Sequence, residues 1–320
     1  MGAEGIITVH NLLILSKHAT DYQNLIQAAD LPGLSISTAS DIDAGAIRGL
    51  ASDIVFGEPS LICRILPQLS GLRWVQSTWA GIETLLDPSL RRDYILTNAR
   101  GVFGGLMSEY VFGYLLAHER RIIERHAAQT AGNWDNTLPG TLRGKNLGLM
   151  GVGSIGACLA RTAKHFGMTV RGYTRTSETC PDVDAYFHQS DRMAFVSDLD
   201  YLVSVLPNTT DTHRIVDAEL LAALPQRAVF INVGRGSAVD EDALADDLHA
   251  GHLAGAVLDV FQEEPLPPGH ILWHTPNVHI TGHTAAPSIP REIAQVFIDN
   301  YRLFLKGAAL LYRVDFERGY

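Results

Sequence analysis

The segment 147–175 constrains the fold more than any other part of the chain. An apolar run at 147–150 leads into Gly151-x-Gly153-x-x-Gly156, and a helical stretch (157–166) and a β-rich run (169–174) follow. This order predicts a strand, a phosphate-binding turn, a helix and a second strand, with glycines for the tight turn, for close approach of a pyrophosphate and for close helix packing. The same glycine pattern also occurs in ordinary turns. The flanking strand and helix favour a dinucleotide site at the helix N-terminus.

Strand-like and helical segments alternate along the rest of the chain. We expect strands at 11–16, 34–38, 53–57, 72–77, 201–206, 228–233, 255–260 and 277–281. We expect helices at 21–29, 43–50 and 289–306, and one long helix over 104–126. Such alternation is typical of parallel sheets covered by helices, and six strands are expected in the unit that contains the glycine pattern.

Composition excludes several classes of partner. The 320 residues, 46% of them hydrophobic, suffice for two buried cores. The net charge of −10, without any basic run, makes nucleic acid and anionic membranes poor partners. Three cysteines without CxxC spacing suit a reducing compartment, without disulfides or a metal site. With no signal-peptide pattern and no apolar run of membrane-spanning length, we expect a cytoplasmic protein that does not bind membranes.

Charged side chains follow three of the predicted strands of the second unit. Arg235 comes after the strand 228–233, Glu264 follows 255–260, and His283 follows 277–281. Because the carboxyl ends of parallel strands meet at one edge of a sheet, these side chains should lie beside the nucleotide site. A cation can bind a carboxylate there, and a carboxylate beside a histidine can control the protonation of its ring. Taken alone, Arg235 could be a surface charge, Glu264 a solvated acid in a loop, and His283 one of 13 histidines, most of which have no function.

Together these motifs resemble the D-isomer-specific 2-hydroxyacid dehydrogenase family, and within it most closely the short glyoxylate/hydroxypyruvate reductases. The resemblance spans nearly the whole chain, and it depends on the run 148–156, Val233-Gly234-Arg235-Gly236, Leu258-Asp259-Val260-Phe261 with Glu264-Pro265, and His283. The sequence departs from the family at Gly282, where a proline often precedes the histidine.

The resemblance implies an α/β fold of two doubly wound parallel-sheet domains. A Rossmann cofactor domain, residues 100–286, would be inserted into a discontinuous flavodoxin-like substrate domain, residues 1–99 and 287–320. It also implies that Arg235 binds the substrate carboxylate and carbonyl, that His283 is the acid/base, and that Glu264 is the partner of His283.

Further contact residues follow from the same resemblance. Substrate contact is implied for the loop Trp79, Ala80 and Gly81, although Trp79 could equally be a filler of the protein core. Cofactor contact is implied for Gly151, Gly153, Ser154, Ile155, Gly156, Pro207, Thr212, Val233, Gly234 and, on the nicotinamide side, Asp259.

The residues at the end of the second strand of the dinucleotide unit indicate which cofactor is preferred. NAD-specific sites usually have an acid about 20 residues beyond the glycine pattern, and this chain has Thr174 and Arg175 there. A hydroxyl and a guanidinium can bind a 2′-phosphate, so we expect NADP to be preferred, with NAD possible. Alternatively, Arg175 points into solvent and either cofactor is used.

The sequence therefore predicts an NAD(P)H-dependent reductase of small 2-oxo acids, such as glyoxylate or hydroxypyruvate, to D-2-hydroxy acids. We expect a homodimer formed through the helix that begins at Gly104 and the arm around Trp134, unless Trp134 folds back on its own domain. Two other functions remain possible interpretations: a dinucleotide-sensing, corepressor-like protein without significant turnover, and a structural subunit that only binds nucleotide.

Overall fold

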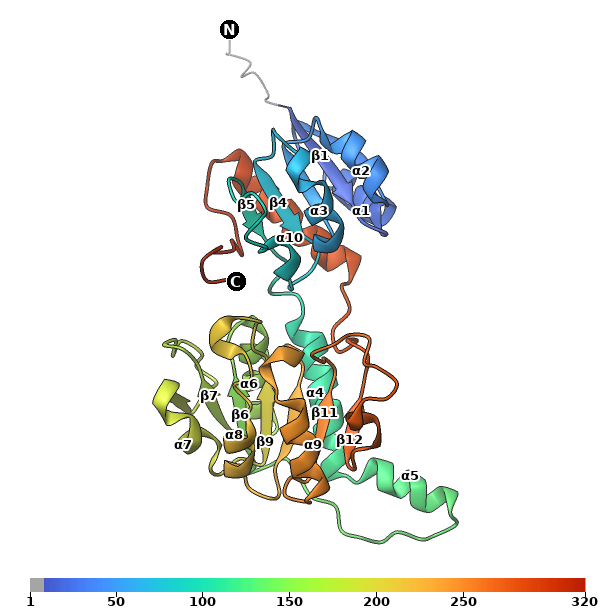
Figure 1. The fold of residues 1–320 in the computed structure, drawn as a ribbon, viewed down its shortest axis with the longest axis vertical. Coiled ribbons are helices and arrows are strands. Elements are labelled where there is room, and N and C mark those ends of the chain that lie inside the picture. The colour runs from blue at the N-terminus through green and yellow to red at the C-terminus, as the bar shows by residue number, and fades with distance from the viewer. Residues whose placement is uncertain (1–8, 320) are drawn as a thin grey trace. The chain divides into compact units, whose positions relative to one another are not determined.

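The computed structural model describes residues 9–319, apart from the side chains of residues 45–47 and 49. The chain divides into two compact units (Figure 1): one runs to Val102 and resumes at Ser288, and the other is Phe103–Pro287. Every pair of neighbouring strands in the two described sheets is parallel. The predicted fold class, two parallel-sheet α/β domains, is confirmed.

The first unit contains a five-stranded sheet in the order β2-β1-β3-β4-β5, the flavodoxin-like order. Its strands are β1 (His10–Leu15), β2 (Leu34–Ala39), β3 (Ile54–Gly57), β4 (Trp74–Ser77) and β5 (Ile95–Thr97). Its helices are α1 (Ala19–Gln27), α2 (Ile42–Gly49), α3 (Pro59–Ile65) and α10 (Pro290–Leu305).

The C-terminal helix α10 belongs to this first unit because it packs on the sheet. The fully buried Trp74 ring of β4 stacks on Phe297 of α10, with ring centroids 5.1 Å apart and planes 2° from parallel. Asn300 of α10 donates a hydrogen bond from Nδ2 to Gln76 Oε1 (3.0 Å). Aromatic packing and a buried polar contact thus join the two separate pieces of chain.

The second unit contains a seven-stranded sheet in the order β12-β11-β10-β9-β6-β7-β8, which is the Rossmann order with one added strand. Its strands are β6 (Asn146–Met150), β7 (Thr169–Tyr173), β8 (Ala185–Phe187), β9 (Tyr201–Ser204), β10 (Val229–Asn232), β11 (Gly255–Leu258) and β12 (Val278–Ile280). Its helices are α4 (Gly104–Glu119), α5 (Ile122–Thr130), α6 (Ser154–His165), α7 (Arg192–Val196), α8 (Ala218–Ala223) and α9 (Glu241–His249).

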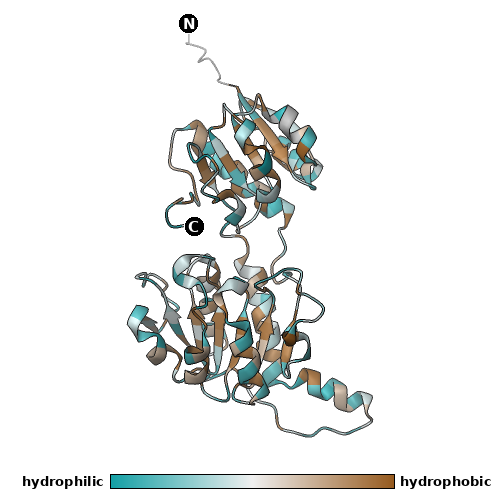
Figure 2. Ribbon diagram, in the orientation of Figure 1, coloured by the Kyte–Doolittle hydropathy of each residue, from teal (hydrophilic) through white to brown (hydrophobic). Residues whose placement is uncertain are grey.

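Alternate residues of the central strands enter two separate cores. Met150, Leu202 and Phe230 belong to one apolar cluster. The neighbouring Leu149 and Val203 belong to the cluster on the opposite face. The apolar strands stand out in the hydropathy view (Figure 2). A parallel sheet buried on both faces requires such continuous apolar runs, which is why the sequence revealed these strands.

Three sequence predictions were wrong or incomplete. The helix expected over 104–126 is broken, because Arg121 has a left-handed backbone (φ 54°) between α4 and α5. The second sheet has seven strands instead of six, since the three-residue edge strand β8 is too short to show a period. The elements α3 and β5 were not predicted at all, and no bounds were predicted for α7, α8 and α9.

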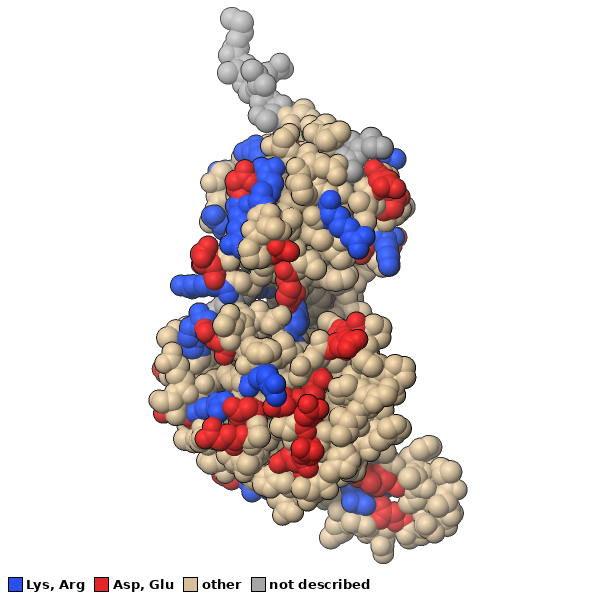
Figure 3. Space-filling view, in the orientation of Figure 1, with Lys and Arg blue, Asp and Glu red and all other residues tan. Residues whose placement is uncertain are grey.

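No helix in the part of the chain that the structure describes is long and apolar enough to cross a membrane. Basic and acidic side chains are interspersed on the face drawn in Figure 3.

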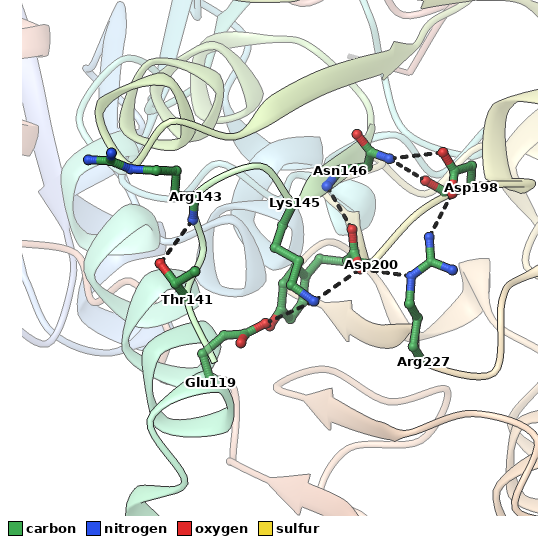
Figure 4. A network of polar contacts seen from close by, with 9 residues as sticks. Glu119, Thr141, Arg143, Lys145, Asn146, Asp198, Asp200 and Arg227 are labelled. Carbon is green, nitrogen blue, oxygen red and sulfur yellow. Dashed lines mark hydrogen bonds and ion pairs between the residues drawn. The ribbon is translucent and has the colours of Figure 1, made fainter. Parts of the chain in front are cut away.

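A polar network joins the amino ends of β6, β9 and β10 (Figure 4). The Asp200 carboxylate accepts hydrogen bonds from the Asn146 N–H (2.9 Å), Lys145 Nζ (3.3 Å) and Arg227 Nε (2.8 Å). Burial raises the pKa of Asp200, but these hydrogen bonds outweigh burial and hold the pKa below its ordinary value. The ionised carboxylate therefore stabilises the folded state.

Replacing Asp200 with Asn should lower the free energy of unfolding at pH 7 by about 2 kcal/mol, the usual range for hydrogen bonds to a charged group. Because the folded-state pKa is lowered, this contribution is present above the ordinary aspartate pKa of about 4 and is lost as pH falls through the folded value. Urea unfolding followed by circular dichroism at pH 7 and at lower pH measures both effects.

Asp198 supplies the matched control, because it also contacts Arg227 (2.6 Å) but its side chain is 58% exposed. Asp198→Asn should cost less than about 1 kcal/mol. Equal losses in the two variants would show that burial of Asp200 has no part in the stabilisation.

Candidate active site

The glycine turn between β6 and α6 has the geometry expected of a phosphate-binding turn. Gly151 has φ 96°, which strongly favours glycine, and a Cβ on Gly156 would lie 2.2 Å from the Gly151 carbonyl oxygen. A Cβ on Gly153, the residue before α6, would meet nothing within 4 Å. The described protein atoms therefore explain two of the three glycines, and the third suits the approach of a phosphate from outside.

The turn that carries Arg235 is fixed by the glycines on either side of it. A Cβ on Gly234 would lie 2.7 Å from the Leu206 nitrogen, and one on Gly236 would lie 1.9 Å from the Phe261 carbonyl carbon. Asn232, the last residue of β10, accepts from the Gly234 N–H (3.2 Å) and donates to the Arg235 carbonyl (3.0 Å). Main-chain packing thus places Arg235 between the segment after β9 and the loop after β11.

His283 and Glu264 form a directly hydrogen-bonded pair. His283 Nδ1 lies 2.8 Å from Glu264 Oε2, and Glu264 Oε1 accepts from the Phe261 N–H (3.0 Å). An ionised carboxylate can only accept, so in that state Glu264 keeps a proton on Nδ1 and leaves Nε2 available for proton exchange. The side chains of His283 and Glu264 are 55% and 35% exposed, respectively, so a small ligand can reach the pair.

The backbone of His283 is held in an unusual conformation. Its φ of 56° is left-handed, which costs a residue other than glycine about 1–2 kcal/mol. The His283 N–H donates to the Asp259 carbonyl (2.7 Å), and the Asp259 carboxylate accepts from the N–H groups of Thr284 (2.8 Å) and Ala285 (3.0 Å). Asp259 is 1% exposed, so this buried carboxylate clamps the turn that carries the histidine.

The residues expected on the adenosine side surround the glycine turn and the neighbouring strand ends. Thr212 donates to the Pro207 carbonyl (2.6 Å) and braces the loop after β9. Thr174 Oγ1 donates to the Ser177 carbonyl (2.7 Å), and Arg175 pairs with Asp211 of that loop (3.0 Å). Ser154 and Ile155 form the first turn of α6, and Val233 follows β10.

Trp79, Ala80 and Gly81 lie in the first unit, just after β4. Ser77 Oγ donates to the Trp79 carbonyl (2.8 Å) and Asn98 Nδ2 donates to the Ala80 carbonyl (2.8 Å), so the loop is anchored at two points. Trp79 is 44% exposed, which rules out the alternative that it fills the core. Its role in substrate contact stays a prediction.

The sequence did not reveal two residues behind the histidine turn. The hydroxyl of Thr281 donates to Asp259 Oδ1 (2.5 Å), and the hydroxyl of Tyr110 lies 2.7 Å from Thr281 Oγ1. Tyr110 and Thr281 are 171 residues apart, and neither stands in a motif.

The comparisons with known proteins agree with this geometry. Residues 112–285 match the sequence model of the family described as D-isomer specific 2-hydroxyacid dehydrogenase, NAD binding domain. The chain is similar to a solved D-isomer specific 2-hydroxyacid dehydrogenase family protein from Aeromonas salmonicida, with 39% identity over 97% of this chain and 100% of that one and a TM-score of 0.91.

Two further solved structures carry a dinucleotide. One is a D-isomer specific 2-hydroxyacid dehydrogenase from Xanthobacter autotrophicus in complex with NADPH and MES, with 32% identity over 98% of this chain and 100% of that one and a TM-score of 0.89. The other is an NADPH-dependent glyoxylate/hydroxypyruvate reductase from Sinorhizobium meliloti in complex with NADP and sulfate, with 29% identity over 97% of this chain and 100% of that one and a TM-score of 0.85.

Alanine substitutions at two glycines of the turn should separate binding from stability. Gly153→Ala meets no described protein atom, so the fold should be kept while dinucleotide affinity falls by about tenfold or more, because the added methyl occupies the phosphate approach. Gly156→Ala clashes with the Gly151 carbonyl and should lower the melting temperature. Calorimetric titration with NADPH and thermal unfolding measure the two quantities, and unchanged affinity in Gly153→Ala would contradict the prediction.

Proposed function

Since the chain belongs to the D-isomer specific 2-hydroxyacid dehydrogenase family, we propose that it reduces small 2-oxo acids, such as glyoxylate or hydroxypyruvate, to D-2-hydroxy acids with NADPH. The observation that carries the proposal is the His283–Glu264 pair, 2.8 Å apart, at the same sheet edge as Arg235 and the glycine turn. The name of the Sinorhizobium meliloti relative supports the substrate class.

Each side chain has a distinct task in the proposed reaction. When bound, the reduced nicotinamide supplies a hydride to the substrate carbonyl carbon. Arg235 binds the substrate carboxylate and stabilises negative charge as it develops on the carbonyl oxygen. His283 donates a proton from Nε2 to that oxygen, while Glu264 orients the ring through Nδ1 and stabilises the charged imidazole.

The cofactor preference is part of the proposal. Arg175 and Thr174 stand where NAD-specific sites usually have an acid, and two relatives were solved with NADPH or NADP. The Arg175 guanidinium would bind the 2′-phosphate by leaving Asp211, which holds it in this structure at 3.0 Å. NAD would then bind more weakly, because it lacks that phosphate.

Initial rates on a panel of 2-oxo acids test the proposal directly. We expect turnover of glyoxylate or hydroxypyruvate with NADPH, and a fall in kcat of about 10²- to 10⁴-fold in His283→Asn, a replacement that tolerates the left-handed backbone. His274→Asn, at an exposed histidine, is the control and should match the wild type. Binding of NADPH without turnover of any panel member would favour the corepressor-like alternative.

A second prediction concerns Arg175. Arg175→Ala should raise the KM for NADPH by about ten- to a hundredfold and leave the KM for NADH nearly unchanged, because only a charge-assisted phosphate contact is lost. Asp211→Asn should lower the KM for NADPH, since it removes a competing carboxylate. Equal use of both cofactors by the wild type, or equal weakening of both in Arg175→Ala, would refute the NADP assignment.

We also propose a homodimer that uses the arm formed by α5 and the segment up to Leu138. The arm projects from the second unit in Figure 1, and α5 buries none of its residues. Trp134 is 90% exposed and Leu138 is 88% exposed, so Trp134 does not fold back on its own unit. A second copy of the chain would cover this apolar surface.

Light scattering should therefore give the mass of a dimer at micromolar concentration. Trp134→Ala should shift the equilibrium toward monomer, whereas Trp273→Ala, at an exposed tryptophan that is not part of the arm, should not. A monomeric wild type at that concentration would overturn the dimer proposal.

A further inference from the structure

A chain of hydrogen bonds runs from helix α4 to the turn that carries His283. Because the Asp259 carboxylate can only accept, Thr281 donates its single hydroxyl proton to Asp259 Oδ1 (2.5 Å). The Thr281 oxygen must then accept from the Tyr110 hydroxyl, 2.7 Å away. The direction of each hydrogen bond is thus fixed by the chemistry of its acceptor.

Tyr110, the donor at one end of this series of hydrogen bonds, is held in place by packing. Tyr110 is partly buried against the apolar cluster that covers one face of the sheet, and its ring centroid lies 5.0 Å from that of Tyr114 on the same helix. Burial also raises the pKa of the Tyr110 hydroxyl above its ordinary value, so the hydroxyl keeps the proton that it donates.

The acceptor at the other end of the hydrogen-bond chain is Asp259, which holds the turn that carries His283. The Asp259 carboxylate also receives the N–H groups of Thr284 and Ala285, and the Asp259 carbonyl receives that of His283. The strained backbone at His283 is stable only because several contacts around it hold it in place. The orientation of the Asp259 carboxylate, which makes two of these contacts, therefore affects the position of the His283 imidazole. Thr281 and, through it, Tyr110 fix that orientation.

We propose that Tyr110 is a positioning residue for His283, acting through Thr281 and Asp259. The proposal rests on the role of His283 in the proposed function. Tyr110 itself contacts neither His283 nor Glu264 in the interactions described, so its effect is on where the proton donor stands and not on the proton transfer itself.

Tyr110→Phe is the direct test because it removes one oxygen and keeps the ring. We expect kcat to fall by about three- to tenfold, the effect of one lost hydrogen bond, with the dissociation constant for NADPH unchanged. The primary isotope effect with NADPH deuterated at the transferred position should rise, since a displaced proton donor makes the chemical step more rate-limiting. Tyr301→Phe, which removes one tyrosine hydroxyl bonded to a carbonyl (2.9 Å) in the other unit, should leave kcat unchanged.

A double-mutant cycle tests the route. Thr281→Val should lower kcat at least as much as Tyr110→Phe, and the double variant should be no slower than Thr281→Val alone, because Tyr110 acts only through Thr281. Effects that multiply would overturn the route, and a kcat of Tyr110→Phe equal to that of Tyr301→Phe would overturn the proposal.

Hydrogen exchange gives a readout that needs no substrate. The amides of residues 281–285 should exchange faster in Tyr110→Phe and Thr281→Val than in the wild type or Tyr301→Phe. A wild type without turnover would refute the proposed function, and exchange would still decide whether Tyr110 holds the turn. Unchanged exchange in both variants would refute the positioning role.

Discussion

The second unit depends on a sheet that is buried on both faces. Every residue of β9, β10 and β11 is buried, and alternate side chains enter opposite apolar clusters. Such strands have little room for polar side chains, and the polar Ser204 and Asn232 are the last residues of their strands. Reactive groups are therefore confined to the segments that follow the strands, and parallel pairing gathers these segments at one edge.

Main-chain contacts give the site its rigidity. The glycines beside Arg235 let its turn pack directly against the backbone after β9 and after β11. His283 is held by three amides that converge on a single buried aspartate. The side chains of Arg235 and His283 therefore extend from turns whose backbones cannot shift independently. Holding reacting groups in a productive geometry requires such a rigid backbone.

The sequence revealed those parts of the fold whose physical signal is local. Continuous apolar runs identified the central strands, and the glycine pattern identified the turn between β6 and α6. The three-residue strands β5 and β8 are too short for any period, and the break at Arg121 depends on a backbone angle that no residue type there demands. The pairing of Glu264 with His283 followed from the family pattern, and the structure supplies the contact. Tyr110 and Thr281 meet only through the folded sheet, so nothing in their sequence neighbourhoods could have linked them.

The left-handed backbone at His283 has a consequence for evolution and engineering. Stability alone would select glycine or asparagine at this position, because only they adopt such a backbone at little cost. A histidine at this position opposes thermodynamic optimisation, so a redesign guided by stability alone would replace it. A search for thermostable variants of this chain should therefore hold position 283 fixed and look for compensating gains elsewhere, as expected where activity and stability trade against each other.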